Sequence, residues 1–393
     1  MRRVQRSVRD EAGMSLVFVG MGLMAFLSAS MLAIDVGMLM TARNQAQNSA
    51  DAGALAGATA LVYDDYDDHS ASGPAVTSAI TAGLANQVMA KDVALESSDV
   101  EFLNDPTGEP NRVRVTVHRR ASRGNPLSTL IAQYFGTPTA DIGARATAEA
   151  SAANAMTCVK PFTIPDRWKE VGADAPWDAD DDYDAFDNKS NPLPVGEADV
   201  YIPAYYPNST TPNPNYSGYN NTKNKGMLLV LRAGTGANIN TSFYFSLSMT
   251  DDMGGSDYRW NIANCNHKIY HHDDPLIQEP GAMSGPTIQG AEELVARDPG
   301  AHWNDSDDTV EGSAFGTHSP RVFPIPLYDP QYYDEGKRNG RNASLKTANW
   351  IGFFLERVVG NQIYGRIIPI AGILDKNSPA GTAAFPKAIR LVQ

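Results

Sequence analysis

Residues Gly13–Ile34 read GMSLVFVGMGLMAFLSASMLAI and carry no charged side chain. As an α-helix, a run of this length spans about 33 Å, enough to cross the roughly 30 Å hydrocarbon core of a bilayer. We therefore predict a transmembrane helix over residues 13–36. A cleavable signal peptide is the alternative, but the run is longer than a signal core and its small residues lie inside it, which favours a retained anchor.

Basic residues are distributed unevenly around this run. Arg43 is the only basic residue between the run and Lys91, whereas four arginines precede it: Arg2, Arg3, Arg6 and Arg9. Because cytoplasmic flanks of membrane helices are enriched in Lys and Arg, the N-terminus is predicted to lie in the cytoplasm. Everything after about residue 40 is then expected outside the membrane.

A stripe of small side chains extends the predicted helix beyond the membrane. No proline occurs between Thr41 and Leu61. Small residues recur there on one helical face: Ala42, Ala46, Ala50, Gly53, Ala54, Gly57 and Ala58. Such a face lets another helix approach closely, so we predict a helix-packing surface. The alternative is an Ala-rich stalk without a partner.

Several segments resemble a known family. Arg9–Gly13, Ile34–Gly37 and Ala46–Ala58 are similar to the N-terminal module of TadE/TadG-like proteins of the tight-adherence (Flp) pilus system. Further segments resemble the long TadG-like members: Pro280–Gly281, Gly285–Gly290, Ser319–Pro330 and Phe353–Glu356. The resemblance implies a bacterial inner-membrane protein that acts in pilus assembly, or as a minor or tip subunit, with other pilin-like or Tad proteins as partners.

Two features of related proteins are not matched. Pilin precursors are cut after a Gly and carry Glu at the fifth mature position, but Phe18 stands five residues after Gly13. Many TadG-like proteins contain a von Willebrand A domain, in which an apolar strand ends in an Asp-x-Ser-x-Ser metal signature. No predicted strand here ends in one. We therefore expect a long TadG-like form without that domain, and no cell-adhesion role resting on it.

Composition limits the partners and the redox environment. The net charge of −13 argues against nucleic acid, because binding phosphates requires a basic surface. The chain has two cysteines, Cys158 and Cys265, and in an oxidising exterior we predict that they form one disulfide. Two unpaired buried thiols are the alternative.

The pattern of elements predicts an α+β fold in three parts. Residues 1–62 hold the Arg-rich tip, the transmembrane helix and the Ala-rich stalk. Residues 63–157 read as a helix (75–89), two strands (100–103 and 113–118), a helix (127–135) and a strand (140–150), and so predict a small α+β domain. Residues 158–393 are predicted to be mostly β and rich in loops, with strands near 227–231, 243–248, 321–324, 350–355 and 364–368, and with an extended surface excursion over 188–225.

Alternating carboxylates form the first candidate metal site. Asp178, Asp180, Asp182 and Asp184 are spaced like the first ligands of a calcium loop. Tyr183 and Lys189 stand where an EF-hand needs Gly and Glu, so an EF-hand is excluded. A calcium ion in an irregular loop and a solvated acidic loop are both left open.

A second candidate lies in Cys265–Asp274. His267 and His271 would share a face if this segment were helical, and with Asp273 they could bind zinc. The alternative is a surface loop beside the disulfide. Nearby, Gly281, Gly285 and Gly290 are predicted to form tight turns.

The sequence carries no nucleophile elbow, zinc-protease motif, phosphate loop or dinucleotide fingerprint, so we predict no enzyme, no cofactor and no catalytic residues. The expected function is a non-enzymatic role in Tad/Flp-type pilus assembly or in the pilus, with the domains after the helix in the periplasm or at the cell surface. The alternative is a membrane-anchored, metal-dependent binding protein or hydrolase with its site around Asp180, Asp182 and His271. The surface ligand of the C-terminal domain is not predicted.

Overall fold

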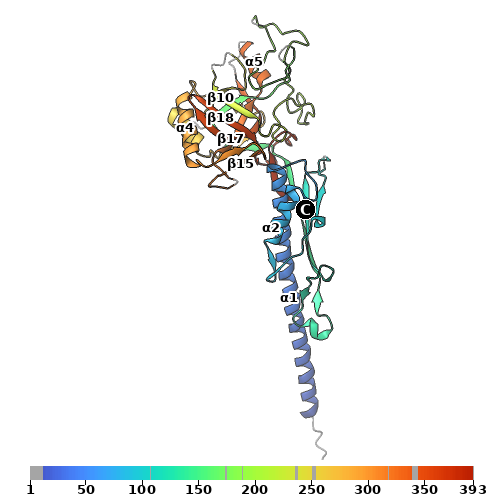
Figure 1. Ribbon diagram of the computed structural model, residues 1–393. Coiled ribbons are helices and arrows are strands. Elements are labelled where there is room, and N and C mark those ends of the chain that lie inside the picture. The colour runs from blue at the N-terminus through green and yellow to red at the C-terminus, as the bar shows by residue number, and fades with distance from the viewer. Residues whose placement is uncertain are drawn as a thin grey trace, which may run out of the picture. The chain divides into compact units, whose positions relative to one another are not determined.

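The computed structural model describes residues 12–106, 108–172, 175–187, 189–234, 238–249, 254–316, 318–338 and 344–392. The four N-terminal arginines lie outside the described residues. The chain forms two compact units (Figure 1). Unit 1 contains residues 1–58, 68–148 and 391–393, and unit 2 contains residues 59–67 and 149–390. The predicted division into residues 1–62, 63–157 and 158–393 stays a prediction.

One uninterrupted helix, α1 (Ala12–Tyr63), carries the N-terminal sequence. The helix is rich in Ala, Leu and Met, which favour helices, and contains no proline that would break it. The prediction that the apolar helix continues past residue 36 is confirmed. The helix α2 (Pro74–Leu84) lies beside α1, and its proline occupies the first turn, where no backbone donor is lost (Figure 1).

Unit 1 also contains most of a four-stranded sheet in the order β19-β7-β4-β3. These strands are β3 (Val100–Leu103), β4 (Arg112–Arg119), β7 (Ile142–Ala152) and β19 (Lys387–Val392), and the division between the units falls within β7 and β19. Burial alternates strictly along β4: Val113, Val115 and Val117 are buried, whereas the residues between them are less so. One face of the sheet therefore packs inward. Two short strands, β1 (Gln87–Val88) and β2 (Lys91–Asp92), form a hairpin after α2.

The helix predicted over 127–135 is not formed. The strands β5 (Leu127–Ser128) and β6 (Thr139–Ala140) pair antiparallel, and the single 3₁₀ turn η3 (Ala132–Phe135) lies between them. We call Leu127–Ala140 the β5–β6 hairpin. Gly136 stops the turn in a left-handed conformation with φ of 89°. The amides that would start a helix here donate to a side chain of α1 instead, as described below.

Unit 2 is built on a sheet that closes into a barrel. Its strands are paired in the order β17 (Leu345–Val359), β16 (Val322–Tyr328), β9 (Phe162–Pro165), β11 (Phe243–Ser246), β10 (Leu228–Ala233) and β18 (Gln362–Ile368), and β18 pairs back onto β17. The strand β13 (Pro275–Leu276) adds to β17. The five strands predicted in this region all correspond to barrel strands. Short paired strands complete the unit: β8 (Ala155–Met156) with β12 (Tyr270–His271), and β14 (His302–Asn304) with β15 (Thr309–Glu311).

Unit 2 is mostly β, as predicted, and its described residues also form helices at positions for which none was predicted: α3 (Gly255–Ala263), α4 (Ser284–Arg297) and α5 (Pro330–Arg338). The predicted tight turns at Gly285 and Gly290 are wrong, because both residues lie within α4. A Cβ at Gly290 would lie 2.8 Å from the Cβ of Ile262 in α3. This glycine therefore allows close packing of two helices.

The predicted surface excursion over 188–225 is only partly a surface segment: many of its described residues are exposed, Val195 among them, but others are buried. Tyr201 and Tyr219 belong to the buried core of unit 2, and the Asn221 side chain donates a 2.8 Å hydrogen bond to the carbonyl of Trp350. The ring of Tyr201 is buried while its hydroxyl donates a 3.0 Å hydrogen bond to Asp166, so a segment without regular structure can still cover a core.

Candidate functional site

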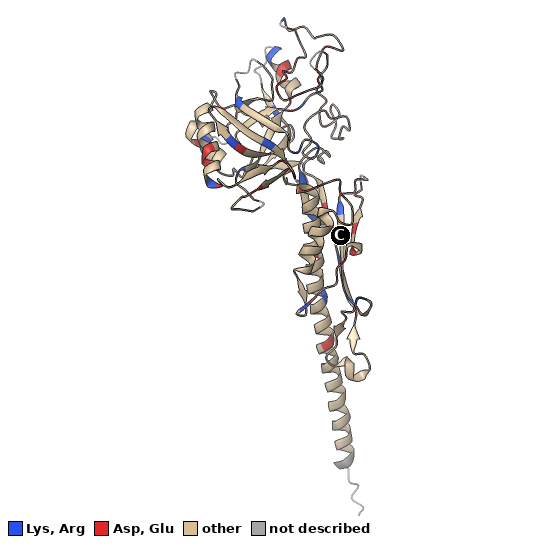
Figure 2. Cartoon of the chain, viewed as in Figure 1, with Lys and Arg blue, Asp and Glu red and all other residues tan. Residues whose placement is uncertain are grey.

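The N-terminal half of α1 is exposed and almost without charge. From Met14 to Met40 most of its large apolar side chains are exposed, and none of its most apolar 18-residue window is buried inside the protein. Figure 2 shows this half as an almost continuous tan stretch. A helix buried in a soluble core would hide these side chains. The structure thus provides a helix long and apolar enough to cross a membrane.

The C-terminal half of α1 is packed. All five alanines of the stripe are fully buried: Ala42, Ala46, Ala50, Ala54 and Ala58. A Cβ at Gly53 would lie 2.9 Å from the carbonyl oxygen of Ala79 in α2, and one at Gly57 would lie 2.8 Å from a methyl of Val113 in β4. The stripe therefore receives α2 and the sheet of its own unit.

A buried carboxylate marks the transition between the two halves. Asp35 is only 4% exposed. Its oxygens accept hydrogen bonds from three consecutive backbone amides of the β5–β6 hairpin: Leu130 at 2.9 Å, Ile131 at 3.1 Å and Ala132 at 2.6 Å. Hydrogen bonds to an ionised acceptor are the stronger ones, so this contact fixes the hairpin to α1.

This division of α1 coincides with the comparison with known proteins. Residues 13–60 match the family described as putative Flp pilus-assembly TadE/G-like. The N-terminal helix is TadE/G-like. No curated protein and no solved structure matches the chain. The resemblance of residues 280–356 to long TadG-like members lies outside the matched segment and stays a prediction.

The TadE/G-like segment includes both halves of α1, and the packed half corrects one expectation. We expect from the sequence that the small-residue stripe receives a helix of another pilin-like protein. In the structure the stripe is already covered by α2 and β4, because its glycines admit their backbone and methyl groups at close range. A helix from another chain would have to displace them.

The acidic loop does not converge on one point. The Asp182 carboxylate accepts hydrogen bonds from the side chains of Asn238 at 2.7 Å and Asn240 at 3.0 Å, and Asp180 accepts one from Ser242 at 3.1 Å. Asp178 accepts a hydrogen bond from the amide of Asp180. Asp184 contributes its backbone amide to a separate carboxylate, that of Asp199. Among the residues that the structure describes, no group of three or more His, Cys, Asp or Glu side chains is placed to hold a metal ion.

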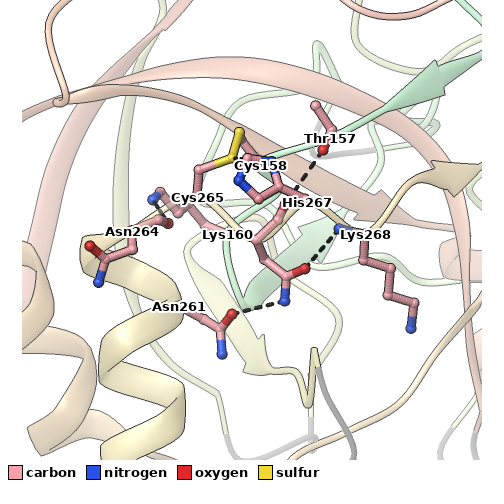
Figure 3. The surroundings of a disulfide bond; sticks show 9 residues. Thr157, Cys158, Lys160, Asn261, Asn264, Cys265, His267 and Lys268 are labelled. Atoms are coloured by element: carbon pink, nitrogen blue, oxygen red, sulfur yellow. Dashed lines mark hydrogen bonds between the residues drawn. A yellow bond between two sulfur atoms is a disulfide. The ribbon is translucent and has the colours of Figure 1, made fainter.

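The predicted disulfide forms between Cys158 and Cys265 (Figure 3). The Cys158 amide donates to the carbonyl of Asn266, and the Lys160 ammonium donates to that of Asn264 at 2.8 Å. Burial lowers the pKa of Lys160 to about 7, with Arg297 a second, electrostatic cause. The disulfide thus links the segment between β8 and β9 to the segment that follows α3.

The histidines near this disulfide do not form the zinc set considered above. The segment is not helical: His271 lies in β12, where its ring contacts Asp375 at 3.0 Å and Asp274 at 3.4 Å. His267 is exposed beside Cys265, 3.7 Å from its sulfur. Asp273 pairs instead with His272 and Lys346.

One Asp-x-Ser-x-Ser spacing does occur, at Asp68, Ser70 and Ser72. It lies between α1 and α2 rather than after a strand, and the Asp68 carboxylate accepts the Ser70 amide at 2.8 Å. The carboxylate therefore stabilises a turn.

The sequence does not predict two buried acids, Asp35 and Asp166, that each accept several hydrogen bonds. Asp35 has no local signal, because its partners lie about a hundred residues away in the sequence. Asp166 in unit 2 accepts hydrogen bonds from the hydroxyls of Tyr201 and Tyr216 and from the amide of Tyr219. Burial raises the pKa of Asp166 to about 7.

Proposed function

We propose that this chain is a non-enzymatic inner-membrane protein of a Tad/Flp-type pilus system. In this proposal residues 13–34 of α1 cross the membrane, with the N-terminus in the cytoplasm and the residues after the span outside. The observation that carries it is the exposed apolar half of a TadE/G-like helix that continues without a break into the packed half. The unequal distribution of arginines supports the orientation.

The continuous helix suggests a mechanical role. Because α1 contains no proline and its packed half is held by α2 and β4, the membrane-spanning half of α1 would move together with the rest of unit 1. Contacts with other pilin-like or Tad proteins would then use the exposed half, where Gly20 and Gly22 have open space around them. Small residues of this kind permit close helix approach within a membrane. Whether the chain is an assembly factor or a minor or tip subunit depends on what it contacts there.

Extraction of membranes tests the anchor. We expect the wild-type chain to remain in the membrane pellet after alkaline carbonate treatment. Replacing Phe18 and Phe26 with Arg places two charges within the span, at an estimated cost of roughly 2.5–3.5 kcal/mol each, and should release the chain or prevent insertion. Replacing the exposed Tyr206 of unit 2 with Arg is the control. Complete release of the wild-type chain would contradict the proposal.

A further inference from the structure

The β5–β6 hairpin exposes apolar side chains at the membrane end of unit 1. Leu130 is 53% exposed, Tyr134 81% and Phe135 73%. The surrounding segment, Gly124–Ala140, contains no Asp, Glu, Lys, Arg or His. A surface loop in water usually carries charge and hides its aromatic rings, so this hairpin suits a less polar environment.

Contacts along α1 show how close to the N-terminal half of the helix this hairpin lies. Val113 of β4 meets Gly57, and the carbonyl of Arg145 in β7 accepts a hydrogen bond from Gln47. The hairpin contacts Asp35, about 18 Å further toward the N-terminus than Gln47 at 1.5 Å per residue. Asp35 directly follows Ile34, the last residue of the uncharged run. The hairpin is therefore held where the proposed span ends.

We propose that the β5–β6 hairpin is a membrane-interface foot, with Tyr134, Phe135 and Leu130 immersed in the lipid headgroup region of the outer leaflet beside α1. This inference rests on the proposed membrane anchor. The lipid surface is the occupant that the structure favours, because the hairpin is hydrogen-bonded to α1 at Asp35, whose neighbours Ile34 and Val36 are exposed apolar residues. Aromatic rings favour this region of a bilayer, where their apolar faces are shielded and a tyrosine hydroxyl still meets water.

Asp35 acts as the positioning residue of this foot. An acid at the edge of the hydrocarbon is costly unless its charge is satisfied. Here three backbone amides donate hydrogen bonds to the carboxylate, which gives each of these amides an acceptor. The carboxylate thus ties the hairpin to α1 and sets the depth of the hairpin relative to the span.

Depth-dependent fluorescence quenching tests the foot in the full-length chain reconstituted into phosphatidylcholine vesicles. Phe135→Trp adds one tryptophan to the hairpin, and Tyr134→Trp serves as an independent second probe. The matched control is Leu84→Trp at the end of α2, which is 40% exposed. Its neighbour Gly83 contacts Ser49, about 21 Å further along α1 than Asp35. The emission of the wild-type chain, which comes from the native tryptophans, is subtracted from that of each variant.

With lipids brominated near the headgroup, we expect most of the added emission of Phe135→Trp and Tyr134→Trp to be lost, and that of Leu84→Trp to be unchanged. If the tryptophans at positions 134 and 135 resist quenching by the brominated lipids as well as the tryptophan at position 84 does, the proposed foot is overturned. Carbonate extraction of the same vesicles separates the two claims. Retention without quenching overturns the foot alone, whereas release of the chain overturns the anchor and the foot together.

Discussion

The Ser49 hydroxyl of α1 donates a 2.7 Å hydrogen bond to the carbonyl oxygen of Gly83 in α2, and both groups are buried. Serine in a helix commonly bonds a carbonyl of its own preceding turn. Here it bonds a neighbouring helix, which is close enough because the residues between the two backbones are Ala and Gly. This contact shows that the small-residue face of α1 serves the internal packing of unit 1.

Adding a methyl group to this face should destabilise unit 1. Gly53→Ala places a Cβ 2.9 Å from the Ala79 carbonyl, whereas Gly37→Ala meets nothing within 4 Å. Both changes gain about 1 kcal/mol of helix propensity, so Gly37→Ala is expected to be neutral or stabilising and Gly53→Ala destabilising. Thermal unfolding of the two variants in the same detergent measures the difference. Equal melting temperatures would contradict the packing described for α1 and α2.

Removing the Asp35 carboxylate should free the β5–β6 hairpin. Asp35→Ala leaves three amides without their acceptor, at a cost of about 1–3 kcal/mol for each group that stays buried. We expect faster hydrogen exchange at residues 130–132 and little change in β4. Asp141→Ala, at an exposed acid near the same hairpin, is the control. Unchanged exchange at 130–132 in Asp35→Ala would show that the carboxylate does not hold the hairpin.

The buried Asp166 predicts a pH dependence of stability. Its folded pKa of about 7 lies above the ordinary value of 3.8 because of burial, so the folded state binds a proton that the unfolded state has lost between these values. The contribution to stability is complete below pH 4 and is lost as pH rises through 7, on the order of a few kcal/mol. Asp166→Asn resembles the protonated acid and should flatten this dependence in denaturant titrations of the full chain. If Asp166→Asn leaves the dependence of the unfolding free energy on pH unaltered, Asp166 is not its source.

The disulfide should contribute substantially to the stability of unit 2. Cys158 and Cys265 are separated by 107 positions, and closing a loop of this size is worth roughly 5 kcal/mol in the chain-entropy description. The double variant Cys158→Ala/Cys265→Ala is expected to shift the denaturation midpoint of unit 2 strongly and to leave the exchange protection of α1 in place. An unchanged denaturation midpoint would contradict this prediction and would indicate that the surrounding hydrogen bonds stabilise unit 2 without the disulfide.

The N-terminal helix and the strand β4 were predictable from local pattern. The uncharged run of α1 and the strict alternation in β4 are signals that need no distant partner. The closed strand order of the barrel was not predictable, because it depends on pairings such as Phe353 with Ile367 and Leu327 with Ile164, whose register no local pattern specifies.

The missed elements show where local pattern misleads. Leu127, Ile131 and Phe135 repeat every fourth residue and so resemble one face of a helix, but the acceptor that decides the conformation is Asp35 in another element. The glycines of α4 predict tight turns at Gly285 and Gly290, but both lie in a helix, whose first turn accepts Pro286. The small-residue stripe predicted close packing but carried no information on whether the partner was internal.

The most direct test of the account is mass spectrometry of the chain purified from inner membranes and from sheared pili, with carbonate extraction of the membranes. The account predicts that the carbonate-resistant protein contains peptides covering Met14–Arg43, so that the apolar half of α1 is retained as the anchor. A mature chain that begins after Ile34 and is released as a soluble protein would contradict it, because the apolar run would then have served only as a signal peptide.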